Sequence, residues 1–205
     1  MKINTNTWNK IRYTIYTPIY DSLGRIFAES RKKSISSLEI KDDDRVLIIG
    51  AGTGLDLEFL NSNCEITATD ITPAMIKKLS KRGKLLKLNV DAKVMDGQKL
   101  LFPDNTFDKV ILHLILAVIP DPVTCIKEAE RVLKSGGAIA VFDKFVPTKQ
   151  KISFGRRVIN LFTNFLFSDI TRSFEKIIAE TKLITVSDEK ADFGGIFRII
   201  TLRKN

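Results

Sequence analysis

Histidine and cysteine are scarce in this chain of 205 residues, which contains one histidine and two cysteines. Cys64, Cys125 and His113 show no spacing typical of a metal site or a redox-active pair. We therefore expect no bound metal. Both cysteines lie beside apolar segments, so we expect inert thiols in a reducing compartment.

Long hydrophobic runs are absent too. No apolar stretch approaches the roughly 20 residues of a membrane-spanning helix. The polar start, MKINTNTWNK, does not resemble a secretory leader. These absences predict a cytoplasmic location. The length is sufficient to bury a hydrophobic core, and we expect residues 1–205 to form a single domain.

Acidic residues are outnumbered, with 24 Asp and Glu against 33 Lys and Arg, which gives a net charge of +9. An excess of positive charge favours anionic partners such as nucleic acid, an anionic membrane face or a phosphorylated substrate. A basic but merely solvated surface is the alternative, and charge alone leaves both open.

What the chain does have is a glycine-rich turn, GAGTG at 50–54, directly after the apolar residues 46–49. The apolar run predicts a strand buried on both faces, as in parallel sheets. Glycines let the backbone pass close to a ligand, and the N-terminus of a helix starting at Leu55 suits an anionic group. Asp70 follows the next predicted strand, 65–69, where an acid can accept hydrogen bonds from ribose hydroxyls. The pair predicts a nucleoside site; the alternative is an ordinary glycine-rich turn.

Strands and helices alternate along residues 45–142. This alternation predicts an α/β, Rossmann-like doubly wound fold with helices on both faces of a mostly parallel sheet and ligands at the carboxyl ends of its strands. A C-terminal antiparallel hairpin would complete seven strands. We expect strands at 46–49, 65–69, 92–95, 107–116, 138–142, 183–186 and 196–202, and helices at 22–38, 55–60, 73–82, 121–133 and 169–180. Glycine in Ser135-Gly136-Gly137 would end the helix at 121–133 with a left-handed cap.

Two further segments carry aromatic or apolar residues beside basic ones. Residues 1–39 contain the only tryptophan and all three tyrosines, and residues 146–168 include an amphipathic helix at 156–167 flanked by lysine and arginine. We interpret them as a helical lid segment and an apolar lid insertion, either of which could lie at a membrane interface. Ordinary helices packed on the sheet are the alternative.

Four motifs carry a resemblance that covers nearly the whole chain from Tyr13 onward. The chain resembles class I S-adenosylmethionine-dependent methyltransferases. An N-terminal Tyr-Asp pair and the run before residue 110 make it similar to the branch with quinone C-methyltransferases and bacterial phospholipid N-methyltransferases. The motifs are VLIIGAGTG (46–54), TDITPAMI (69–76), MDGQKLLFPDNTFDKV (95–110) and ERVLKSGG (130–137).

The resemblance implies S-adenosylmethionine as the cofactor and S-adenosylhomocysteine as its product. It places the glycine turn beside the methionine moiety and ribose, Asp70 at the ribose hydroxyls and Asp96 at the adenine amino group. The implied cofactor-binding residues are Gly50, Ala51, Gly52, Thr53, Gly54, Asp70, Ile71, Met75, Asp96, Gly97, Gln98, His113 and Leu114.

Ile48 departs from the family pattern, which has an acid two residues before the first glycine. Asp56 is close enough in sequence to be a substitute. The family's phosphoethanolamine methyltransferases pair a histidine at the position of His113 with an N-terminal tyrosine, which would be Tyr20, or else Tyr16 or Tyr13. Such a histidine could take a proton from an ammonium substrate, or it could simply line the pocket.

The sequence thus favours a methyltransferase acting on a small molecule or lipid, with the amine headgroup of phosphatidylethanolamine as the specific hypothesis and a possible peripheral position at an anionic inner membrane face. A quinone-type or other C-, O- or S-methyltransferase is an alternative. A nucleic-acid methyltransferase is disfavoured because residues 113–116 read HLIL, where base N-methyltransferases have Asn/Asp-Pro-Pro-aromatic. Ile48 also leaves open a non-catalytic binding protein.

Overall fold

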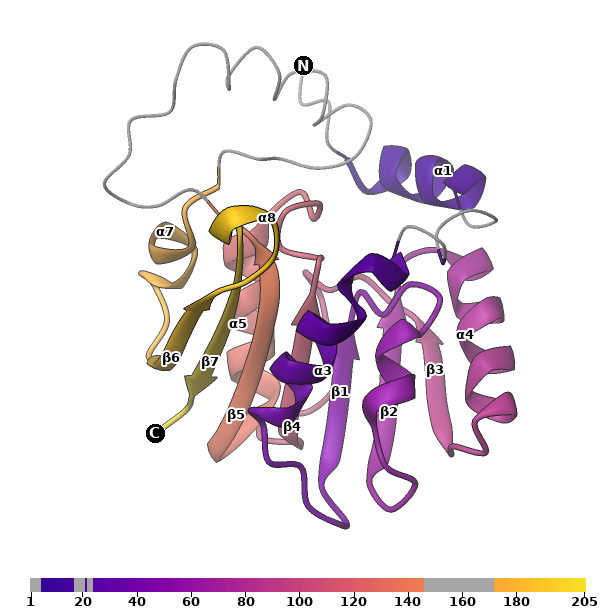
Figure 1. The fold of residues 1–205 in the computed structure, drawn as a ribbon, viewed down its shortest axis with the longest axis horizontal. Coiled ribbons are helices and arrows are strands. Elements are labelled where there is room, and N and C mark those ends of the chain that lie inside the picture. The colour runs from indigo at the N-terminus through magenta and orange to yellow at the C-terminus, as the bar shows by residue number, and fades with distance from the viewer. Residues whose placement is uncertain (1–4, 17–20, 22–23, 146–171) are drawn as a thin grey trace.

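A computed structural model describes residues 5–16, 21, 24–145 and 172–205 (Figure 1). Seven strands form one sheet in the order β3-β2-β1-β4-β5-β7-β6, in which β1 to β5 are parallel and β7 is antiparallel to both β5 and β6. The predicted fold class and C-terminal hairpin are confirmed. The strands are β1 (Arg45–Ile49), β2 (Glu65–Asp70), β3 (Val90–Val94), β4 (Phe107–His113), β5 (Leu133–Lys144), β6 (Ile184–Lys190) and β7 (Phe197–Arg203).

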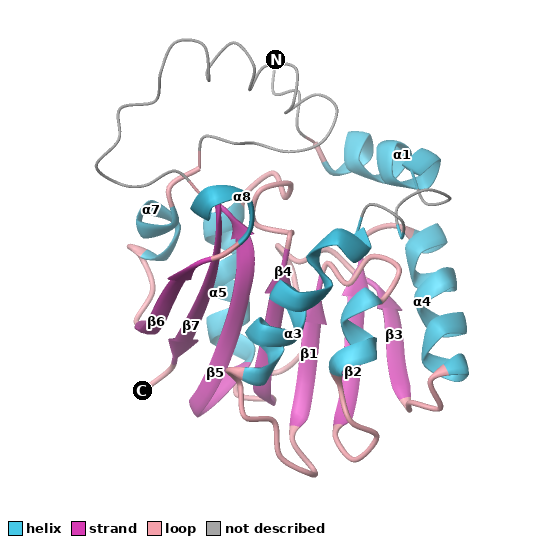
Figure 2. Cartoon of the chain, in the orientation of Figure 1, coloured by secondary structure: helices cyan, strands magenta, loops and turns pink. Residues whose placement is uncertain are grey.

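Helices cover both faces of this sheet (Figure 2). The helices α5 (Pro122–Val132) and α7 (Phe174–Ile178) lie on one face, and α3 (Ala28–Ser36) and α4 (Pro73–Leu85) lie on the other. Side chains alternate along β1 accordingly: Leu47 and Ile49 pack toward α5, whereas Val46 and Ile48 pack in the cluster that includes residues of α3 and α4. This period of two, apolar on both sides, explains the continuous apolar run in the sequence.

The described parts of the N-terminal segment are two helices and a short turn. Helix α1 (Asn6–Tyr16) lies above the sheet near α4 in Figure 1, and the 3-10 turn η1 (Arg25–Phe27) leads into α3. Within the helix predicted at 22–38, residues 25–27 form a 3-10 turn and residues 28–36 form an α-helix. Residues 55–59 also form a 3-10 helix, η2 (Leu55–Phe59), instead of the expected α-helix.

The predicted glycine cap after α5 is wrong. Leu133 already has extended dihedral angles, and β5 begins there. Gly136 does adopt a left-handed φ of 76°, but it does so within the strand. Its N–H donates to the Lys204 carbonyl over 2.8 Å, and Lys204 N–H donates to Gly137 over 3.1 Å. Pairing with the C-terminal residues thus holds the glycines in the sheet.

Several predictions fall outside the described residues, including the apolar lid insertion at 146–168 and the start of the helix predicted at 169–180. Of that helix, the structure describes α7. Strand β3 begins two residues earlier than expected and β6 extends four residues further. Among the residues that the structure describes, no helix has both the length and the apolar character needed to cross a membrane.

Candidate functional site

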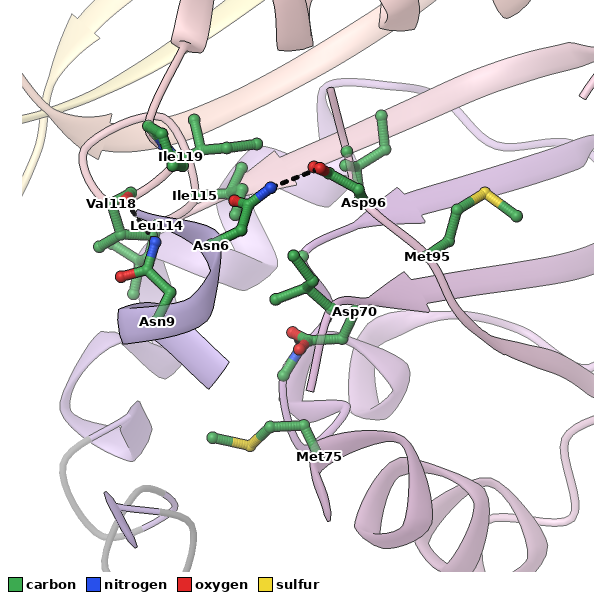
Figure 3. Close-up of a pocket in the computed structure, with 16 residues that line it drawn as sticks. Asn6, Asn9, Asp70, Met75, Met95, Asp96, Leu114, Ile115, Val118 and Ile119 are labelled. Carbon is green, nitrogen blue, oxygen red and sulfur yellow. Dashed lines mark hydrogen bonds between the residues drawn. The ribbon is translucent and has the colours of Figure 1, made fainter. Parts of the chain in front are cut away.

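The strand order reverses between β1 and β4, and an open pocket lies at the carboxyl ends of the strands there (Figure 3). The turn after β1, the ends of β2 and β3, and the segment after β4 form its walls. Eight of the residues implied by the resemblance line it: Gly50, Gly52, Asp70, Ile71, Met75, Asp96, Gly97 and Leu114.

The glycine turn owes its path to left-handed backbone angles at Gly50, Gly52 and Gly54, with φ of 69°, 56° and 82°. A Cβ on Gly50 would also lie 2.6 Å from the Cδ1 of Ile115. Glycine at this position therefore lets the turn approach the segment after β4 closely. Sequence reasoning identified the turn but not Ile115, the residue against which it packs.

Asp70 ends β2 and joins two neighbouring backbone segments. Its Oδ2 accepts the N–H of Gly52 over 2.9 Å, and its Oδ1 accepts the N–H of Thr72 over 2.8 Å. Burial raises the pKa of Asp70, although these two hydrogen bonds act in the opposite direction. Each carboxylate oxygen has a second lone pair, so the side chain can still accept hydrogen bonds from the hydroxyl groups of a ligand in the pocket.

Asp96 follows β3 and lines the pocket on the same side as Asp70 (Figure 3). Its Oδ1 accepts the backbone N–H of Gln98 over 2.9 Å, and its Oδ2 accepts the Nδ2 of Asn6 over 2.6 Å. Gln98 does not line the pocket, but its Nε2 donates a hydrogen bond to Asp96 over 3.0 Å. Asn9, also on α1, donates to the Val118 carbonyl over 3.2 Å.

Asn6 and Asn9 both line the pocket, and sequence reasoning missed them. Their spacing of one helical turn places two polar side chains on one face of α1, which is the only local signal that could have found them. The segment after β4 forms the apolar part of the pocket wall. Leu114 is a non-glycine residue with a left-handed φ of 58° directly after β4, and Ile115 and Val118 follow it in the pocket wall.

His113 does not line the pocket. Its ring is fully buried under α3, where Nδ1 lies 2.7 Å from Asp56 Oδ1 and Nε2 lies 2.9 Å from Ser34 Oγ. Because both ring nitrogens are engaged inside the protein, the geometry does not bring His113 to a substrate. Its proposed partner Tyr20 lies outside the described residues. Tyr13 and Tyr16 belong to α1, but their side chains lie outside the described part of the structure.

The resemblance also implied three residues that do not line the pocket: Ala51, Thr53 and Gly54. Thr53 donates its hydroxyl proton to Asp21 over 2.5 Å. Ile48 is buried in the core, and Asp56, the suggested substitute for the missing acid, forms an ion pair with Arg31 away from the pocket.

The pocket has the chemistry that S-adenosylmethionine requires. Two carboxylates at neighbouring strand ends can accept hydrogen bonds from the ribose hydroxyls and the adenine amino group. The glycine turn leaves room for the methionine moiety. Ile71, Met75 and Met95 offer apolar contacts for the adenine ring. The residues present therefore fit this cofactor.

This sheet, turn and pair of acids agree with the resemblance to class I S-adenosylmethionine-dependent methyltransferases. Residues 47–141 match the family model of a methyltransferase domain, and the chain is a methyltransferase that uses S-adenosylmethionine.

Its curated relatives come from the expected branch. The chain is 26% identical over 189 residues to a phosphatidylethanolamine N-methyltransferase of Cereibacter sphaeroides, which covers 91% of this chain and 93% of that protein. It is 25% identical over 193 residues to a demethylmenaquinone methyltransferase of Listeria monocytogenes serotype 4b (strain CLIP80459), covering 89% and 79%.

Solved structures share the fold at lower identity. A geranyl diphosphate C-methyltransferase of Streptomyces coelicolor A3(2), solved with S-adenosylhomocysteine, superposes with a TM-score of 0.74. It is 14% identical, and the match covers 91% of this chain and 84% of that one. The [4+2]-cyclase SpnF gives the same TM-score, 0.74, at 17% identity over 86% and 81%. These two likenesses bear on the fold alone.

Proposed function

We propose that the methyl acceptor is the amine headgroup of phosphatidylethanolamine, reached at a membrane surface. The observation that carries this proposal is a row of contacting apolar side chains that extends from Leu114 in the pocket wall to the exposed Phe193. Leu114 of the pocket wall packs against a cluster built on Phe142 and Phe197. The ring of Phe27 lies 4.8 Å from that of Phe197 and 6.0 Å from that of Phe193, measured between ring centroids.

Phe193 brings this cluster to the surface. It lies in the short turn α8 (Asp192–Gly195) between β6 and β7, has a φ of 53°, and is 61% exposed. Ile26 and Ile196 are also exposed, and the exposed Arg25 precedes Ile26 in η1. Apolar side chains accompanied by basic charge suit an anionic bilayer, where each basic residue contributes on the order of 1 kcal/mol. We infer a peripheral position on the cytoplasmic membrane face.

The transfer is an in-line displacement at a methyl group that the cofactor, when bound, supplies on a sulfonium. The amine lone pair forms the new N–C bond while the C–S bond breaks. Asp70 and the glycine turn hold the nucleoside end in place, and the apolar segment 114–119 keeps water from the reacting atoms. Since His113 is engaged with Asp56 and Ser34, the ammonium acceptor loses its proton to bulk water before it enters the pocket, and the neutral amine is the species that attacks.

A quinone-type acceptor is the second candidate. The demethylmenaquinone methyltransferases among the relatives favour it, and the apolar wall at Leu114 and Ile115 would suit a prenylated ring as well as an acyl chain. Both acceptors are therefore tested in parallel.

The test is transfer of radioactive methyl from labelled cofactor to vesicles of phosphatidylethanolamine with anionic lipid, to phosphatidylcholine vesicles and to demethylmenaquinone. We expect label in phosphatidylethanolamine, and binding to anionic vesicles that weakens as salt rises. Phe193→Ser should reduce co-sedimentation with vesicles, whereas Leu85→Ser, at an exposed residue of α4, should not. Label in the quinone alone, or equal failure to bind anionic and neutral vesicles, would refute the lipid proposal.

A further inference from the structure

A chain of four polar side chains is buried beneath α3, outside the cofactor pocket. The Arg31 NH1 lies 2.7 Å from Asp56 Oδ1, the same oxygen lies 2.7 Å from His113 Nδ1, and His113 Nε2 lies 2.9 Å from Ser34 Oγ. The side chains of Arg31, Asp56 and His113 are 5%, 3% and 0% exposed. Three elements meet in this network: α3 supplies Arg31 and Ser34, η2 supplies Asp56, and β4 ends at His113.

Asp56 remains ionised in this setting. Burial alone raises the pKa of its carboxyl, but the Arg31 guanidinium and the His113 ring outweigh burial and hold the pKa well below its usual range. A buried ion pair is weak evidence for stability, because the cost of removing two charges from water offsets their attraction. Such a pair does fix geometry, since neither charge can move away from its partner without being left uncompensated.

The network joins the two walls of the cofactor pocket. Asp56 lies two residues after Gly54, so it anchors the exit of the glycine turn. His113 directly precedes Leu114, the strained residue at which the other wall begins. These are the walls that approach each other so closely that a Cβ on Gly50 would come within 2.6 Å of Ile115.

A second contact from the N-terminal segment secures the same turn. The carboxylate of Asp21 accepts the Thr53 hydroxyl at Oδ1 and the Arg82 guanidinium at Oδ2, over 2.5 and 2.7 Å. The turn is thus bound from behind on both sides of Gly54. Meanwhile the position of the family's usual acid is taken by Ile48, whose side chain packs in an apolar cluster with Ile111.

We propose that Arg31, Asp56, His113 and Ser34 form a positioning network that sets the glycine turn against the segment after β4 and thereby fixes the cofactor. In this chain the buried carboxylate of Asp56, and not an acid at residue 48, holds the glycine turn in place. Helix α3 becomes part of the cofactor site although none of its residues lines the pocket. The network acts on cofactor geometry and does not depend on which acceptor is methylated.

The first test is calorimetric titration of the full chain with S-adenosylhomocysteine, each variant being measured well below its own unfolding temperature. Asp56→Asn and Arg31→Ala should each weaken binding by about tenfold, and Arg31→Lys should restore part of the loss. The control is Arg198→Ala in β7, the strand that follows β5 in the sheet. The Arg198 side chain is 13% exposed and pairs with Glu175. It should change the dissociation constant by less than about twofold.

A second measurement needs no variant. The chain has a single histidine, so its ring nitrogen resonances belong to His113 without further assignment. We expect S-adenosylhomocysteine to shift these resonances, although the ring does not line the pocket, because the ligand presses on both walls that the network joins. Unshifted resonances at saturation, or wild-type affinity in a folded Asp56→Asn variant, would overturn the proposal. Neither measurement contains an acceptor, so failure of the lipid proposal leaves this one unaffected.

Discussion

Replacing Asp70 by asparagine should weaken cofactor binding strongly, because its carboxylate has two tasks. It accepts the N–H groups of Gly52 and Thr72 over 2.9 and 2.8 Å, and it presents its remaining lone pairs to the pocket. An amide keeps one acceptor and turns the other toward these donors as an N–H group. Losing hydrogen bonds to a charged acceptor costs about 1.5–3 kcal/mol, which corresponds to roughly a 10- to 150-fold increase in the dissociation constant for S-adenosylhomocysteine.

Calorimetric titration measures this change, and Asp91→Asn is the matched control. Asp91 lies on the neighbouring strand β3, is exposed, and pairs with Lys93 away from the pocket. The control should bind as the wild type does. If Asp70→Asn also binds with wild-type affinity, the carboxylate does not hold the ribose and the assignment of the pocket to S-adenosylmethionine is refuted.

The pH dependence of Asp70 adds a second check. Burial raises its pKa in the folded protein, so the folded state holds the proton more tightly than the unfolded state does. The free energy of unfolding of the wild type should therefore rise, relative to Asp70→Asn, as the pH falls through the window between the two pKa values. Cofactor affinity of the wild type should fall over the same window, because the protonated carboxyl is a weaker acceptor. Parallel trends of stability and affinity would contradict this reasoning.

Two further predictions concern backbone geometry and acid stability. Gly50→Ala should abolish most cofactor binding, because it combines a left-handed φ with a Cβ that meets Ile115, whereas Gly136→Ala, with φ of 76° and nothing within 4 Å, should cost about 1 kcal/mol of stability and leave binding intact. Glu128→Gln should lower the unfolding temperature at neutral pH. Hydrogen bonding to Arg131 lowers the pKa of Glu128, so its contribution is lost as the pH falls through that lowered pKa and the difference in melting curves should then disappear.

The sequence by itself determined the strands of the sheet and the edge of the sheet at which the cofactor pocket lies. The apolar run before the turn, the glycines and Asp70 are local signals: a strand buried on both faces is apolar throughout, and left-handed backbone angles favour glycine. Strand-end positions then follow from alternation, because parallel strands bring their carboxyl ends to one edge. Asp70 and Asp96 were expected at strand ends on these grounds, and both line the pocket. Leu114, which only the family resemblance implied, lines it as well.

Element boundaries were less determined by local signals. Gly136 has the left-handed angle that a helix cap would need, yet it lies in β5 because its N–H finds the carbonyl of Lys204, a partner far along the chain. Residues 55–59 read as the start of an α-helix in the sequence, yet η2 is a 3-10 helix, and Asp56 within it pairs with Arg31 of another helix. Hydrogen bonds between distant residues decide such details, and no window of sequence contains both partners.

Only the tertiary structure decided what His113 does. Its place at the end of β4 predicted a side chain at the ligand, but a strand directs successive side chains to opposite faces, and the ring points under α3 instead of into the pocket. The same packing brings Asn6 from α1 to Asp96, across 90 residues of chain. Spacing in the sequence fixes which residues share a strand end, whereas the docking of the N-terminal helices fixes which of them meet ligand and which meet each other.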